Sequence, residues 1–239
     1  MAQVYVGLSG YSYKPWQGEG RFYPPELKQN EFFHFYSGRY GAVEMDGSWY
    51  QMPGEEAVKG HLANAPEGFK FCFKAHRKVT HLARLKPEAL DPLAFMLKRL
   101  EPMRSKLGPI LLQLPPNLKR DDDRLVAFLT ELPKQIPAQK QWAMEFRNDT
   151  WNDAAVEAIL REHNVAWVAA DTDDKAAQRR DTADFAYSRL RRSEYDAEAL
   201  KNWAAYFTGL NKDCFVYCKH EDEGSPWIWA DQLVALCRS

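Results

Sequence analysis

Short apolar runs recur along the whole chain and alternate with segments of helical periodicity. Eight runs have the length and composition of buried strands, at residues 4–9, 42–46, 69–75, 109–114, 142–147, 165–171, 185–190 and 214–219. Helices are expected over 30–40, 55–65, 91–107, 121–132, 151–163, 196–207 and 229–237. Strands that alternate with helices predict right-handed βαβ units around a parallel sheet.

Eight such units in 239 residues match a (β/α)₈ barrel, which typically contains about 250 residues. The predicted fold class is therefore α/β, with a single-domain TIM-type barrel over residues 1–239. One connection departs from the pattern, because residues 172–183 between the sixth and seventh strands show little apolar periodicity. We expect a loop or a distorted short helix there.

The strand at 142–147 carries charge on one face only. Side chains alternate between the two faces of a strand, so Glu145 and Arg147 point the same way. Trp142, Met144 and Phe146 can then be buried on the other face. In a barrel of this kind, functional groups lie at the C-terminal ends of the strands and in the loops that follow. This strand end is therefore a candidate wall of an active site.

Polar side chains also end the other predicted strands. Together with Glu145 and Arg147 they form a candidate ring of Ser9, Glu44, Asp46, Lys74, Gln113, Asp171, Arg189 and Lys219. Four carboxylates in this ring balance four cations, which suits a polar ligand such as a sugar. Arg191 and Arg192 shift the balance towards positive charge, in a region where such barrels often bind phosphate. We therefore expect a small-molecule ligand, sugar-like or phosphate-bearing, at the barrel mouth.

Glu145 is the first candidate for a general base, with Lys74 or Lys219 as acid or electrostatic stabiliser. Carboxylates and amines in a partly dry pocket can have pKa values moved towards neutrality, as proton transfer requires. A purely structural interpretation stays open, in which Glu145–Arg147 and Glu44–Lys74 are ion pairs that close the barrel top.

Aromatic residues follow the first two predicted strands. Their rings can stack on a sugar or a base, or they can pack long loops over the barrel. These residues are Tyr11, which we take as a candidate ligand contact, and Tyr13, Trp16, Trp49 and Tyr50.

The charge balance narrows the class of protein. With 32 Lys+Arg against 33 Asp+Glu, the chain lacks the basic excess of a general nucleic-acid or membrane-surface binder. No apolar run approaches the ~20 residues that span a bilayer, and the N-terminal residues do not resemble a signal peptide. A cytoplasmic location is expected, with the four cysteines as reduced thiols.

No motif for a metal or a cofactor stands out. His76 and His81 follow the third predicted strand, but their spacing matches no ligand motif. The glycines form no phosphate loop, and there is no nucleophile elbow. We therefore expect neither a metal nor a cofactor, and covalent and redox chemistry are disfavoured.

Six blocks, in order along the chain, resemble the signature blocks of one family. They are GLSGYSY at 7–13 with Trp16 and FYP at 22–24, VEMDGSWY at 43–50, GFKF at 68–71 with Lys74, Ala75, Thr80 and His81, LGP at 107–109 with QLPP at 113–116, EFR at 145–147 with Trp151, and KHEDEG at 219–224. On these blocks the chain resembles the YecE-like family, catalogued as domain of unknown function seventy-two. The resemblance covers essentially the whole chain and implies a (β/α)₈ barrel, but it supplies no reaction.

A relation of such barrels to sugar isomerases is an analogy at the level of the fold. The chain also departs from the family pattern after the seventh strand. Arg189-Leu190-Arg191-Arg192 stands where many members have Arg-Leu-His-Gly, so a role of that histidine does not carry over.

Three hypotheses about function remain open. The leading one is a cofactor-independent isomerase, lyase or hydrolase that acts on a sugar-like or anionic small molecule at the C-terminal mouth of the barrel. The second is a nucleic-acid-acting enzyme that uses the loop aromatics and arginines to hold single strands or damaged duplex, with a salt-dependent affinity. The third is a non-catalytic module that binds a metabolite or a protein segment.

Overall fold

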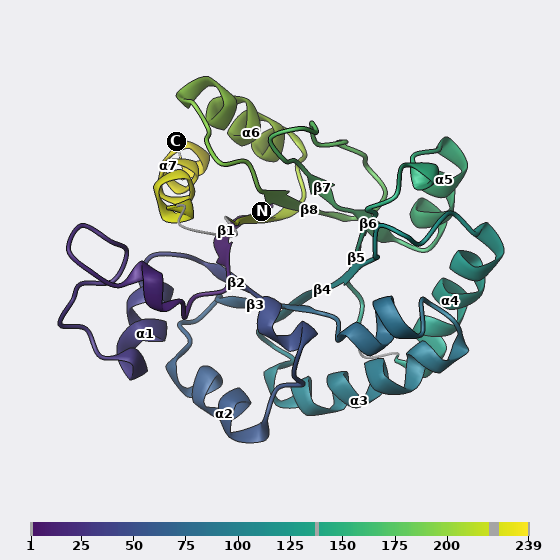
Figure 1. Cartoon of the computed structure of the whole chain (residues 1–239), viewed down its shortest axis with the longest axis horizontal. Helices are drawn as coiled ribbons and strands as arrows, with labels where there is room; N and C mark the ends of the chain where they lie inside the picture. The colour runs from purple at the N-terminus through teal and green to yellow at the C-terminus, as the bar shows by residue number, and fades with distance from the viewer. Residues whose placement is uncertain (1, 137–138, 220–224, 239) are drawn as a thin grey trace.

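The computed structural model describes residues 2–136, 139–219 and 225–238. Its strands form one parallel sheet, in the spatial order β6-β5-β4-β3-β2-β1-β9-β8-β7. The sheet wraps into a nearly closed barrel with helices on its outside (Figure 1). β1 pairs with β9, so the first and last strands meet in the wall of the barrel. The predicted TIM-type barrel is confirmed.

The elements follow one another in the expected alternation. The strands are β1 Val4–Ser9, β2 Ala42–Met45, β3 Lys70–Lys74, β4 Leu107–Gln113, β5 Trp142–Glu145, β6 Val165–Trp167, β7 Ala169–Ala170, β8 Phe185–Leu190 and β9 Asp213–Cys218. The helices are α1 Phe32–Ser37, α2 Glu55–Asn64, α3 Leu90–Leu100, α4 Asp122–Gln135, α5 Ala154–Glu162, α6 Ala197–Gly209 and α7 Pro226–Arg238. Across the described ranges, no helix combines the length and the apolar character needed to cross a membrane.

Three helices begin at an aspartate that caps the first turn. The carboxylates of Asp121, Asp153 and Asp196 accept backbone N–H groups at the starts of α4, α5 and α6. The helix predicted from Trp151 therefore begins later than expected, because Trp151 belongs to a separate 3₁₀ turn, Asp149–Trp151.

The sixth predicted strand divides into two short strands. β6 pairs with β5, whereas β7 pairs with β8, so the chain changes its neighbour within a few residues. At the division, Val168 donates its N–H to the carbonyl oxygen of Met144 at 3.0 Å. The connection that follows, residues 172–183, contains no helix and is the loop that was one of the two expected forms.

A side chain from this loop covers the edge of β6 that does not pair with β5. The hydroxyl of Thr182 accepts the N–H of Trp167 at 2.8 Å and donates to the carbonyl oxygen of Val165 at 2.7 Å. These two hydrogen bonds satisfy backbone groups that a neighbouring strand would otherwise bind. The seam of the barrel between β6 and β8 is therefore closed by a side chain.

Alternation of side chains along the strands creates two hydrophobic cores. The larger core includes Phe71, Phe73, Trp142 and Met144, which face the helices. The smaller core fills the barrel and includes Tyr5, Ala42, Cys72, Leu111, Ala143, Phe185, Tyr187, Phe215 and Tyr217. Side chains fill the interior, as in other barrels of this type, and here small alanines lie beside large aromatic rings. The polar strand ends therefore form a layer over a filled core.

Gly7 allows α1 to reach the sheet between β1 and β2. The hydroxyl of Tyr36 accepts the N–H of Leu8 at 2.7 Å and donates to the carbonyl oxygen of Ala42 at 2.8 Å. A β-carbon on Gly7 would lie 2.0 Å from that carbonyl oxygen and 3.0 Å from the hydroxyl. The close approach therefore requires glycine at this position.

Candidate functional site

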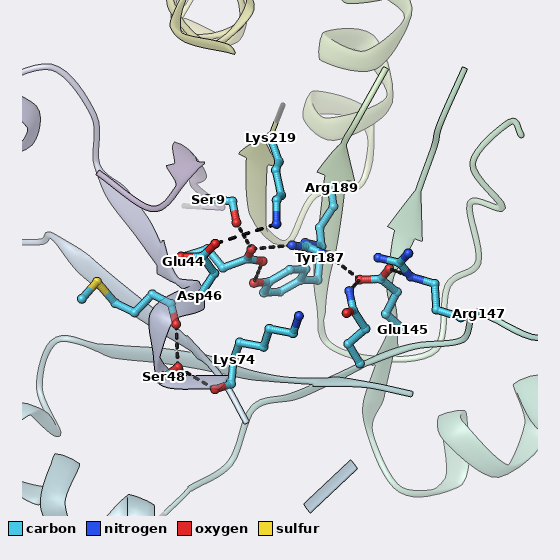
Figure 2. Close-up of polar contacts among 12 residues, drawn as sticks. Ser9, Glu44, Asp46, Ser48, Lys74, Glu145, Arg147, Tyr187, Arg189 and Lys219 are labelled. Carbon is cyan, nitrogen blue, oxygen red and sulfur yellow. Dashed lines mark hydrogen bonds and ion pairs between the residues drawn. The ribbon is translucent and has the colours of Figure 1, made fainter. Parts of the chain in front are cut away.

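Arg189 of β8 lies at the centre of a buried polar network at the barrel mouth (Figure 2). Its Nη2 donates to Glu44 Oε1 at 2.8 Å, and its Nη1 donates to Glu145 Oε2 at 2.7 Å. One guanidinium therefore joins side chains of β2, β5 and β8. The three side chains are at most 2 % exposed, so their charges are compensated within the network.

Two hydroxyl groups complete the Glu44 end of this network. Ser9 Oγ donates to Glu44 Oε1 at 2.5 Å, and the Tyr187 hydroxyl donates to Glu44 Oε2 at 2.7 Å. Burial opposes the charged form of Glu44, but Arg189 and the two hydroxyls outweigh it and hold the pKa below its usual value. Glu44 is therefore ionised at neutral pH.

Glu145 is also held from several sides. In addition to Arg189, Arg147 Nε donates to Glu145 Oε1 at 2.5 Å and Gln113 Nε2 donates to Oε2 at 2.9 Å. The contact with Arg147 confirms that the two side chains share a face of the chain. Burial opposes ionisation, but the charges of Arg189 and Arg147 outweigh it and hold the pKa of Glu145 well below its usual range. Glu145 is thus a weak base with both oxygens engaged.

A cavity of about 560 Å³ opens over this network. Its wall carries positive charge from Lys74, Arg147, Arg191 and Lys219. Among the described residues that line it, Asp46 supplies the carboxylate. Glu44 and Glu145 do not line it. A ligand therefore meets a more positive surface than the balanced ring expected from the sequence. The other lining residues are Tyr13, Pro15, Trp16, Trp49, Tyr50, His81 and Gln113.

Asp46 organises one side of this mouth pocket. Its Oδ2 accepts the Tyr13 hydroxyl at 2.8 Å and lies 3.8 Å from Lys219 Nζ. Gly10 leads the chain from β1 to Tyr13 with φ of +85°, a conformation that favours glycine. A β-carbon there would lie 2.4 Å from the Tyr13 ring. The position of Tyr13 in the pocket therefore depends on Gly10.

Lys74 ends β3, and its amine reaches the space between the two carboxylates of the network (Figure 2). With the residues that the structure describes, Nζ forms no hydrogen bond or ion pair, and it lies 5.2 Å from the centroid of the Trp49 ring. Burial and the charge of Arg189 lower the pKa of Lys74 to about 8, against the opposing effect of Glu44 and Glu145. The Glu44–Lys74 ion pair considered from the sequence is not formed, because Arg189 binds Glu44 instead.

His81 reaches the same pocket from a short π-helix, Lys78–Leu82. Its ring packs edge-on against Trp49 at 5.0 Å between centroids, and Nδ1 lies 2.9 Å from Thr80 Oγ1. Burial and the charge of Lys74 lower the pKa of His81, so the imidazole is mainly neutral at pH 7. A neutral imidazole can accept or pass on a proton. Such π-helical turns occur frequently at functional sites.

Two of the predicted site residues belong neither to the Arg189 network nor to the wall of the mouth pocket. Tyr11 forms a hydrogen bond of 2.7 Å with His61 Nε2 and lines a separate cavity beside α1 and α2. Asp171 Oδ1 accepts the Tyr195 hydroxyl at 2.5 Å and the Arg191 N–H at 2.9 Å. Asp171 therefore orders the loop after β8, and burial raises its pKa.

Tyr187 is a member of the network that the sequence analysis missed. It lies on β8 two residues before Arg189, so strand alternation already places both side chains on one face. A tyrosine within an apolar strand is usually a core residue, which concealed its contact with Glu44. Of the 219–224 block, Lys219 lies within the described residues, and its histidine and acidic residues lie outside them.

Metal ligands and cysteine thiols are the remaining candidates for chemistry in the described part of the chain. It contains no group of three or more His, Cys, Asp and Glu side chains that could hold a metal ion. The four cysteines are free, and Cys72, Cys214 and Cys218 are buried. Burial raises the pKa values of these three thiols, which makes them poor nucleophiles.

Comparison with known proteins places the chain in a family. The family described as "Protein of unknown function DUF72" matches residues 5–239. The UPF0759 protein YunF of Bacillus subtilis (strain 168) is 28 % identical over 157 residues, which cover 62 % of this chain and 52 % of YunF. The UPF0759 protein YecE of Escherichia coli (strain K12) is 28 % identical over 134 residues, which cover 56 % of this chain and 46 % of YecE. The matched part thus spans about half the length of these curated relatives.

Solved structures of the same family share the fold. A DUF72 family protein, TM1631 of Thermotoga maritima MSB8, superposes with a TM-score of 0.85 at 25 % identity, covering 99 % of this chain and 100 % of that one. A DUF72 family protein, EF0366 of Enterococcus faecalis V583, gives a TM-score of 0.76 at 16 % identity, covering 99 % and 96 %. With the family match extending over nearly the whole barrel, this chain belongs to the DUF72 family, the YecE-like family that its sequence blocks resemble.

Proposed function

We propose that this protein is a cofactor-independent enzyme, an isomerase, lyase or hydrolase, that acts on a sugar-like anionic small molecule in the mouth pocket. The charge of the pocket wall is the observation that supports this proposal most. Lys74, Arg147, Arg191 and Lys219 line it, against the single described carboxylate of Asp46. Its volume of about 560 Å³ suits a small molecule, since ligand sites commonly enclose about 300–1,000 Å³.

The geometry supports a different division of roles from the one predicted from the sequence. Glu145 becomes a positioning residue rather than a general base, because two arginines and Gln113 occupy its oxygens. Lys74 and His81 are the proposed proton-transfer groups, since both line the pocket with lowered pKa values. Lys219, which the sequence marks as a candidate acid or electrostatic stabiliser, is the proposed electrostatic stabiliser of the bound anion.

A thermal-shift screen tests this proposal. The ligands are ribose 5-phosphate, glucose 6-phosphate, the two parent sugars, inorganic phosphate, adenosine monophosphate and a short single-stranded DNA. A ligand at 100 times its dissociation constant adds about 2.7 kcal/mol, or roughly 5–10 °C in Tm for a chain of this size. We expect a sugar phosphate to give this shift and its parent sugar to give less.

Arg147→Gln should reduce that shift, because Arg147 lines the pocket. Arg104→Gln is the matched control, since it removes an exposed arginine paired with Glu101 elsewhere on the molecule. Equal shifts with sugars and sugar phosphates would contradict recognition of an anion. A shift without turnover would favour the binding module, and a shift with DNA alone would favour a nucleic-acid-acting enzyme.

A further inference from the structure

The surroundings of Lys74 are those of a nucleophilic amine. Arg189 binds both Glu44 and Glu145, so neither carboxylate is left to pair with Lys74. Within the described residues, its Nζ lies over the face of the Trp49 ring and forms no ion pair. Lys74 also lines the cavity of about 560 Å³, so a ligand can approach the amine. A lysine that is partly desolvated and close to other cations is the type of amine that attacks carbonyl groups.

We propose that Lys74 forms a covalent imine with the aldehyde or ketone group of its substrate. This step rests on the function proposed above, and it narrows the substrate class to anionic sugar-like molecules that carry a carbonyl group. From the sequence, covalent chemistry is disfavoured, because no motif marks Lys74 as a nucleophile. The proposed imine departs from that expectation.

The step is balanced without an oxidant or a reductant. The lone pair of Nζ forms a C–N bond to the carbonyl carbon, and one amine proton passes to the oxygen, which gives a carbinolamine. The second amine proton then passes to the same oxygen, the nitrogen electron pair forms the C=N double bond as the C–O bond breaks, and water leaves. His81 lines the pocket as a neutral imidazole and can carry these protons.

The ionisation of Lys74 agrees with this role. Burial and the charge of Arg189 lower its pKa to about 8. At pH 7.5 about one-quarter of such an amine is unprotonated, against about 0.1 % for an ordinary lysine, a difference of about 200-fold. Charged groups face Lys74 from several elements, namely Glu44 of β2, Glu145 of β5, Arg189 of β8, and Arg147 and Lys219 of the mouth loops, and the titratable but neutral His81 faces it from the short π-helix.

Trapping the imine by reduction tests the proposal. The full chain is incubated at pH 7.5 with sodium cyanoborohydride and either glyceraldehyde 3-phosphate or glyceraldehyde, and each modified lysine is mapped by peptide mass spectrometry. Lys59, which is exposed on α2, is the internal reference, and Lys219 is the reference within the pocket. We expect Lys74 to react at least about 10-fold faster than either reference, with a rate that rises through about pH 8.

The outcomes separate this inference from the proposed function. Labelling of Lys74 no faster than Lys59, or preferential labelling of Lys219, overturns the imine and leaves the anion pocket standing. A third outcome is that Lys74 reacts faster than Lys59, but equally fast with glyceraldehyde and with glyceraldehyde 3-phosphate. That result supports the imine and overturns anion recognition. Lys74→Arg should abolish the fast adduct. If that variant does not fold, the map of modified lysines on the unsubstituted chain decides the question.

Discussion

Replacing Arg189 with methionine should destabilise the barrel strongly. Arg189 is 1 % exposed and donates to Glu44 and Glu145 at 2.8 and 2.7 Å. Breaking a buried ion pair by removing one partner costs about 3–5 kcal/mol, because the other charge stays buried without compensation. We expect this loss in the free energy of unfolding at pH 8, which corresponds to a fall in Tm of roughly 6–20 °C.

The loss should become smaller at low pH. In the unsubstituted protein, burial is outweighed by Arg189 and its neighbours, so the pKa values of Glu44 and Glu145 lie below their usual range. Their contribution to stability is present above the unfolded-state pKa of about 4.3 and is lost as the pH falls through the folded-state values. In Arg189→Met, burial favours the neutral acid form of Glu44. Burying this neutral acid at pH 4.5 costs less free energy than burying the carboxylate at pH 8.

Urea unfolding followed by tryptophan fluorescence at pH 8 and pH 4.5 measures both effects. Arg147→Met is the matched control, because the Arg147 side chain is 31 % exposed and its loss leaves Arg189 in place. Adding Glu44→Gln and Glu145→Gln to Arg189→Met should recover part of the loss at pH 8, since no charge is then buried alone. A loss below about 1 kcal/mol at pH 8, or an equal loss at both pH values, would refute this account.

Three further substitutions test other parts of the structure. Tyr36→Phe should lower the free energy of unfolding by about 2–4 kcal/mol in urea titrations, because two buried backbone groups of β1 and β2 lose their partner; a loss below about 1 kcal/mol contradicts that role. Lys74→Met should raise stability by up to about 3 kcal/mol at pH 7, since a folded-state pKa lowered to about 8 penalises the protonated amine. That gain should vanish as the pH rises from about 8 to about 10.4, and equal stabilities at pH 7 would argue against the lowered pKa. Gly10→Ala should displace Tyr13 and reduce the thermal shift with a sugar phosphate, and an unchanged shift would exclude Tyr13 as a ligand contact.

The comparison of β5 with β6 and β7 shows how far sequence patterns predict this fold. The run at 142–147 alternates clearly, and its two faces were assigned correctly. The run at 165–171 has the pattern of one strand, but the chain changes neighbours at Val168. Apolar composition indicates that a segment is buried, but it does not indicate which neighbour each residue binds. The hydroxyl of Thr182 closes that seam, and no local pattern marks it.

The candidate site divides in the same way. Strand alternation by itself determined which side chains share a face of one strand, such as Glu145 with Arg147, because the period of a strand is a local property of the chain. The tertiary structure decided their pairing, since Arg189 is 145 residues from Glu44 and 44 residues from Glu145 along the chain. An ion pair depends on distance through space, which the order of the strands and the curvature of the sheet set. That pairing leaves Lys74 without a carboxylate partner among the described residues and turns a ring of balanced charges into a pocket with a positive wall.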